Sequence, residues 1–140
     1  MAERAVLDTS ACLALLENEG GADVVEAHLL EARAGRASLG ASFATLTEVE
    51  YIITQERGAA DALDAIEKIK AWPVQWHHSD DAMCSAAAKL KAANRLSFAD
   101  SFIVALAQRL DAVLFHKDPE ITVLGEAVKQ QMLPSKGTPL

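Results

Sequence analysis

The chain has 140 residues, which is enough for one domain with a single hydrophobic core. Hydrophobic residues make up 51% and charged residues 24%, a globular composition, and no apolar run approaches the roughly 20 residues of a membrane-spanning helix. The formal net charge of −7 argues against a protein that holds nucleic acid by a broad basic face.

The N-terminal stretch MAERAVLDTS contains Glu3 and interrupts its apolar run at Asp8. It therefore lacks the apolar centre of a secretory signal, and we expect a cytoplasmic protein. The two cysteines, Cys12 and Cys84, lie among apolar neighbours and have no metal-binding or redox spacing. Both are expected to be buried thiols.

The first half of the chain alternates between strand and helix patterns, each bounded by caps and glycines. The expected elements are a strand over residues 4–8, helices over 9–20 and 22–35, a weaker strand over 36–42, and helices over 43–58 and 59–71.

The second half continues the alternation. We expect a strand over 72–78, helices over 79–94 and 96–110, a strand over 112–116, and a weaker fifth strand over 127–133. Ser79 is expected to cap the helix that follows it. Strands that alternate with helices predict an α/β fold with a mainly parallel sheet of four or five strands. One domain is expected over residues 1–134, followed by a short tail over 135–140.

The stretch LSFADSFIVALAQRL, residues 96–110, carries a carboxylate near the start of a helix apolar enough to be buried. Ser97 and Asp100 have the spacing of a capping box, in which each would satisfy a backbone amide at the helix start. The alternative is that Asp100 is a functional carboxylate, and the other acidic residues bear on that choice.

Ligands of parallel α/β sheets bind beyond the carboxyl ends of the strands. Asp8 ends the first predicted strand, Asp118 follows the fourth, and Asp100 begins the helix before the fourth, so we expect all three at one crevice. Glu48 is expected to reach the same crevice, whereas Glu50 lies about 200° away around the helix, so that one site can use only one of them. Converging carboxylates repel unless a cation neutralises them, and oxygen ligands favour Mg²⁺ or Mn²⁺ over zinc.

Four segments then resemble the acidic blocks of a PIN domain: VLDTSA (6–11), TEVEY (47–51), LSFADSFIVALA (96–107) and HKDPEI (116–121). Their order and spacing agree with that family over nearly the whole chain. The compact form with a terminal strand like AVKQQMLP further resembles the toxins of toxin–antitoxin pairs, of the virulence-associated protein C (VapC) type.

The resemblance implies a metal-dependent endoribonuclease with Mg²⁺ or Mn²⁺ as cofactor. It places Asp8, Glu48, Asp100 and Asp118 in the catalytic, metal-binding positions, and only this alignment prefers Glu48 to Glu50. Glu120, where the family often carries a further acid, is an additional candidate metal ligand.

The resemblance also implies partners. These are an RNA substrate, a second copy in a homodimer, and a cognate antitoxin protein that binds apolar helix faces around Leu13, Leu16, Val24 and Ile52. Candidate RNA contacts are Lys89, Lys91 and Arg95 in the segment KLKAANR, together with Lys117. A solvated helix face explains the KLKAANR charges equally well.

One position departs from the family pattern. The family usually has Thr or Ser where this chain has His116, two residues before Asp118. The imidazole can replace the hydroxyl contact, touch a metal or merely end the strand, and we favour the last. The alternative function is a catalytically decayed PIN-like module that binds protein. A phosphoaspartyl hydrolase fits less well, because Ser10 stands where that chemistry needs a second acid.

Overall fold

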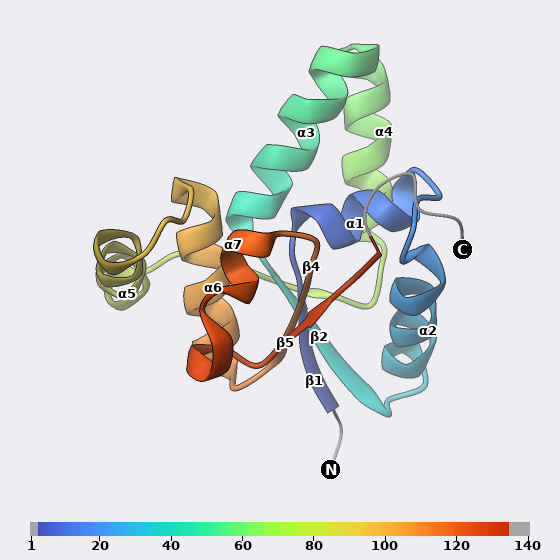
Figure 1. Cartoon of the computed structure of the whole chain (residues 1–140). Coiled ribbons are helices and arrows are strands. Elements are labelled where there is room, and N and C mark those ends of the chain that lie inside the picture. Colours follow the sequence, from blue (N-terminus) through green and yellow to red (C-terminus); the bar gives the residue numbers. More distant parts are fainter. Residues whose placement is uncertain (1–2, 135–140) are drawn as a thin grey trace.

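The computed structural model describes residues 3–134, in which a parallel five-stranded sheet is covered by helices on both faces (Figure 1). The strand order is β3-β2-β1-β4-β5, and every neighbouring pair is parallel. The predicted α/β class is confirmed, and the fifth strand pairs. The tail expected over 135–140 lies outside the described residues.

The strands are short and follow the predicted order. They are β1 (Glu3–Leu7), β2 (Ala37–Ser42), β3 (Gln75–His77), β4 (Val113–His116) and β5 (Gln130–Met132). Successive side chains of a strand point to opposite faces. In β1, Val6 therefore packs with Ile103 and Leu114 in one core cluster, while Leu7 packs with Phe115 in the other.

The helices connect the strands as crossovers. They are α1 (Thr9–Leu16), α2 (Ala22–Arg33), α3 (Phe43–Arg57), α4 (Ala59–Lys70), α5 (Asp81–Ala93), α6 (Phe98–Leu110) and the short α7 (Pro119–Thr122). A 3₁₀ turn covers Gly125–Ala127. Neither α7 nor this turn was expected, because segments of three or four residues are too short to show helical periodicity.

Helices α3 and α4 form a hairpin that extends away from the sheet (Figure 1). They are joined at Gly58, whose φ of +96° favours glycine over any residue with a side chain. Within residues 3–134, no helix is long and apolar enough to cross a membrane.

Two local expectations were wrong, both in α5. Asp80, not Ser79, caps this helix, because its Oδ1 accepts a hydrogen bond from the amide of Met83 at 2.7 Å. Cys84 is exposed, whereas Cys12 is buried. Helix α5 buries only the stripe that contains Met83 and Ala87, and Cys84 lies next to that stripe.

Candidate active site

Four carboxylates lie at the edge of the sheet where the strands end. Asp8 follows β1 and caps α1, Asp118 follows β4 and caps α7, and Asp100 lies in the first turn of α6. Glu48 lies in the second turn of α3, which starts where β2 ends. Parallel strands bring these helix starts to one edge, as predicted.

Asp8 is buried, with 4% of its surface exposed. Its Oδ1 accepts hydrogen bonds from the amide of Ala11 at 2.8 Å and from the hydroxyl of Ser10 at 2.7 Å. The pKa of Asp8 is nevertheless raised to about 7, chiefly by burial. The two hydrogen bonds lower it, and the negative charges of Asp100 and Glu48 raise it by smaller amounts. Asp8 is therefore close to both of these carboxylates.

Asp100 lies at a capped helix start and also beside the other carboxylates. Its amide donates a hydrogen bond to the hydroxyl of the N-cap Ser97 at 3.1 Å, so the helix start is capped as the spacing predicted. Its carboxyl group belongs to the cluster. Burial raises the pKa of Asp100 to about 6, opposed by a hydrogen bond with Ser97 and supported by the charges of Asp118 and Glu48 and a hydrogen bond with Asp118.

The structure brings Glu48, not Glu50, to the cluster. Glu48 is half-buried, and its Oε1 accepts a hydrogen bond from the hydroxyl of Thr9 at 2.5 Å. That hydroxyl also lies 3.3 Å from the hydroxyl of the fully buried Thr45. Glu50 is exposed and lines a shallow hollow along the outer side of α3.

Three hydroxyl residues that hold the cluster were missed by sequence reasoning. These are Thr9, Ser10 and Thr45. The only local signal was the position of Thr9 and Ser10 directly after Asp8. Their partners depend on how α1 packs against α3, which no local pattern reveals.

Asp118 is held by hydrogen bonds on two sides. Its Oδ1 accepts from the amide of Glu120 at 2.9 Å, and its own amide donates to Nδ1 of His116 at 3.0 Å. The Nε2 of His116 lies 2.9 Å from Oε1 of Gln130 in β5. Glu120 is exposed, and the group that contacts Asp118 is its amide rather than its carboxylate.

The cluster fits a divalent cation in donor type and in charge. All four side chains offer carboxylate oxygens, which Mg²⁺ and Mn²⁺ prefer. The raised pKa values of Asp8 and Asp100 reflect burial first and, to a smaller extent, the negative charge of the neighbouring carboxylates. In the described part of the chain, however, no three His, Cys, Asp or Glu side chains stand close enough together to hold one ion in this arrangement.

The candidate RNA contacts fall into two environments. Lys89 and Lys91 lie near the end of α5 and Arg95 lies in the following loop, and all three are exposed beside the start of α6. Lys117 is different, because only 9% of its side chain is exposed and its ammonium lies 3.7 Å from Oε1 of Glu19.

Comparison with known proteins gives the family. The PIN domain family matches residues 5–126. No curated protein matches the sequence.

Solved structures show the same fold at low identity. The VapBC2 complex of Rickettsia felis, bound to promoter DNA, matches with a TM-score of 0.75 and 12% identity over 94% of this chain and 99% of that chain. DNA-bound VapBC of Salmonella typhimurium matches with a TM-score of 0.73 and 16% identity over 94% and 98%. VapC20 of Mycobacterium tuberculosis, described as a sarcin-ricin loop cleaving toxin, matches with a TM-score of 0.65 and 17% identity over 86% and 95%.

The family match spans most of the chain, from the middle of β1 to the turn before β5, and it includes all four carboxylates. This chain belongs to the PIN-domain family.

Proposed function

We propose that this protein is a metal-dependent endoribonuclease and the toxin of a toxin–antitoxin pair. The convergence of Asp8, Glu48, Asp100 and Asp118 at one edge of the sheet carries the proposal, because the pKa values of Asp8 and Asp100 are raised to about 7 and about 6. Perturbed carboxyl groups that gather in one place are typical of functional sites. The similarity of the fold to VapC toxins supports the proposal.

The chain's own residues prepare the site for phosphate chemistry. Bound Mg²⁺ or Mn²⁺ would supply the charge that attracts a phosphate and lowers the pKa of water. Thr9 and Ser10 hold the carboxylates of Glu48 and Asp8 by hydrogen bonds, so these two side chains are fixed in advance. The cluster itself is anionic, so it would repel RNA until a cation is bound. This explains how an acidic protein can act on a polyanion.

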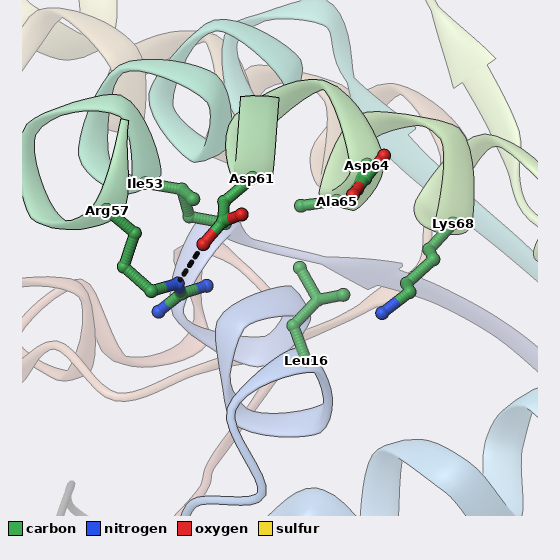
Figure 2. A pocket seen from close by; sticks show the side chains of 7 residues that line it. All are labelled: Leu16, Ile53, Arg57, Asp61, Asp64, Ala65 and Lys68. Carbon is green, nitrogen blue, oxygen red and sulfur yellow. Dashed lines mark ion pairs between the residues drawn. The ribbon is translucent and has the colours of Figure 1, made fainter. Parts of the chain in front are cut away.

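We also propose a binding site for the antitoxin along α1 and the α3–α4 hairpin. One hollow of about 280 Å³ is lined by Leu16, Ile53, Arg57, Asp61, Asp64, Ala65 and Lys68. Figure 2 shows Leu16 of α1 pointing toward this hollow, with the Arg57–Asp61 ion pair on one side and Lys68 on the other. Leu16 lies among charged side chains there, and this combination suits an amphipathic segment of a partner protein.

A second hollow of about 400 Å³ is lined by Ser10, Leu13, Glu17, Glu19, Ile52, Glu56 and Lys117. Ser10 also donates its hydrogen bond to Asp8, so a segment in this hollow would reach the carboxylate cluster. Of the four residues predicted to contact the antitoxin, Leu13, Leu16 and Ile52 line these hollows and Val24 lines neither. The homodimer implied by the resemblance and the cytoplasmic location expected from the N-terminal stretch are part of the same proposal.

Cleavage of RNA by the purified chain tests the enzymatic proposal. We expect cleavage with Mg²⁺ or Mn²⁺, none with excess EDTA, and a loss of orders of magnitude in Glu48→Gln. Glu50→Gln is the matched control, because Glu50 lies on the same helix but away from the cluster. A folded wild type that neither cleaves RNA nor gains thermal stability with Mg²⁺ would favour the decayed binding module instead.

A further inference from the structure

An exposed aromatic ring stands on the first turn of α6, two residues before Asp100. Phe98 is 68% exposed, and its ring centroid lies 5.2 Å from that of Phe102. Phe102 is buried and packs edge-on against Phe43 at the start of α3, again at 5.2 Å. Phe98 is therefore the outermost of three rings and is supported from below, so that it presents a fixed aromatic surface.

Beside this ring lies a small apolar hollow between α5 and α6. Its volume is about 240 Å³, and its walls are Cys84, Ala87, Ala88, Lys91, Phe98, Ser101 and Phe102. Pockets that enclose a whole small ligand usually measure about 300–1,000 Å³. This hollow is smaller and nearly without polar walls, so it suits one flat ring rather than a complete ligand.

The surroundings of the hollow are basic although the protein is acidic. Lys89, Lys91 and Arg95 are exposed there, and the ammonium of Lys91 is fixed by donating to the carbonyl oxygen of Leu96 at 3.0 Å. In the part of the chain that the structure describes, none of the three pairs with an acidic side chain. The amino end of α6 adds a partial positive charge. A flat ring attached to an anionic backbone matches this combination.

The position of the ring relative to Asp100 limits which nucleotide it can meet. Residues two apart on a helix lie about 200° apart around its axis. Phe98 and Asp100 therefore stand on opposite flanks of the same helix end. A base stacked on Phe98 would belong to a nucleotide near a phosphodiester at the carboxylates, and the RNA between them would cross the amino end of α6.

We propose that Phe98 stacks on an unpaired base next to the cleaved phosphodiester, with Lys89, Lys91 and Arg95 holding the adjoining phosphates. This rests on the function proposed above and assigns to it the residues that bind RNA beside the carboxylates. Stacking on an aromatic ring tolerates any base, since every base has a π-face. A continuous duplex is excluded because its bases are already stacked within the helix.

Equilibrium binding of labelled single-stranded RNA to the full chain tests the proposal. It is measured with Mg²⁺ present and with Glu48→Gln in every variant, the wild-type reference included, so that the RNA is bound but scarcely cleaved. We expect Phe98→Ala to weaken binding about tenfold and Phe98→Trp to retain it. Leu63→Ala is the control, since Leu63 is 57% exposed on α4 and does not line the hollow beside Phe98. An RNA lacking one base at the stacked position should bind the wild type more weakly but bind Phe98→Ala as tightly as the intact RNA does.

Equal binding by the wild type and Phe98→Ala would overturn the inference. So would a change in oligomeric mass of Phe98→Ala with unchanged RNA binding, because the ring would then cover a second copy of the chain. The proposed function is judged separately by Mg²⁺-dependent cleavage. If the wild type cleaves RNA but Phe98→Ala binds RNA equally well, only the stacking role is wrong. If the wild type neither binds nor cleaves RNA, both proposals are wrong.

Discussion

The imidazole Nδ1 of His116 accepts a hydrogen bond from the amide of Asp118 at 3.0 Å. The ring is fully buried, and its Nε2 lies 2.9 Å from Oε1 of Gln130, so Nε2 carries the proton and Nδ1 is the acceptor. Burial lowers the pKa of His116, which favours this neutral form. His116 ends β4, as expected, but it also fixes the backbone that presents Asp118. A Ser or Thr hydroxyl at position 116 can also accept a hydrogen bond from the backbone amide two residues later. The imidazole therefore makes a contact that such a hydroxyl can make.

Substitutions of Gln130 test this arrangement at a distance from the carboxylates. Gln130→Ala leaves the buried Nε2–H of His116 without its acceptor, and we expect a loss of roughly 1–3 kcal/mol in the free energy of unfolding. Gln130→Glu keeps an acceptor oxygen and should lose less. Urea denaturation measures both values, and nitrogen NMR shifts of the imidazole report its tautomer. Equal stabilities of the two variants would show that the Gln130 contact does not hold the ring.

The pH dependence of stability should reflect Asp8. Burial raises the pKa of Asp8 from an ordinary value of 3.8 to about 7 in the folded chain, so the native state binds the proton more tightly. The free energy of unfolding of the metal-free protein should therefore fall as the pH rises from about 4 to about 7, and then level off. Each pKa unit corresponds to about 1.4 kcal/mol, so we expect a change of a few kcal/mol.

Asp8→Asn is the comparison for this experiment, because its amide oxygen can still accept from Ala11 and Ser10. Denaturation curves at several pH values should show a flatter profile for the variant than for the wild type. Parallel profiles would mean that Asp8 does not carry a raised pKa.

Asp100→Asn separates capping from function. The hydrogen bond from the backbone amide of residue 100 to Ser97 remains. Removing the charge should relieve the cost of burying it and the repulsion by Asp118 and Glu48, and so stabilise the metal-free protein by roughly 1–3 kcal/mol above pH 7. RNA cleavage should fall by orders of magnitude, and Mg²⁺ should raise the melting temperature less than in the wild type. A variant that melts lower without metal and cleaves RNA at the wild-type rate would limit Asp100 to a capping role.

The hydroxyl of Thr9 should position Glu48. Thr9→Val removes the donor to Glu48 Oε1 at nearly constant volume, and we expect about 10- to 100-fold weaker Mg²⁺ binding or activity. Thr9→Ser keeps the hydroxyl and should restore most of that loss. Titration calorimetry with Mg²⁺ measures the effect independently of RNA. Identical Mg²⁺ affinities for the Val and Ser variants would rule out a positioning role for the hydroxyl.

The ends of the RNA products report which group attacks phosphorus. Attack by water needs no ribose 2′-hydroxyl, so the products should carry a 5′-phosphate and a 3′-hydroxyl. Mass spectrometry of a cleaved oligonucleotide distinguishes these ends. Products with 2′,3′-cyclic phosphates would contradict hydrolysis by water.

The sequence was most informative where a residue's position along a strand or helix decides its place. Asp8 and Asp118 follow parallel strands. Parallel strands end at the same edge of a sheet, so the sequence could predict that both residues lie there. Contacts between distant segments were not. The hydrogen bond from Thr9 to Glu48 spans 39 residues and that between His116 and Gln130 spans 14, and both depend on how the elements pack. The four-residue helix α7 was too short to leave a periodic signal.

Helix α3 carries Glu48, Ile52 and Glu56 at intervals of four residues, which places them along one stripe. Glu48 belongs to the carboxylate cluster, whereas Ile52 and Glu56 line the hollow of about 400 Å³ beside it. Under the proposed function, the antitoxin and the RNA therefore bind to adjoining parts of the same face of α3. A mutation on α3 that improves antitoxin binding would also move the side chains that contact RNA, and the reverse holds too. Inhibition and catalysis should therefore evolve together rather than independently.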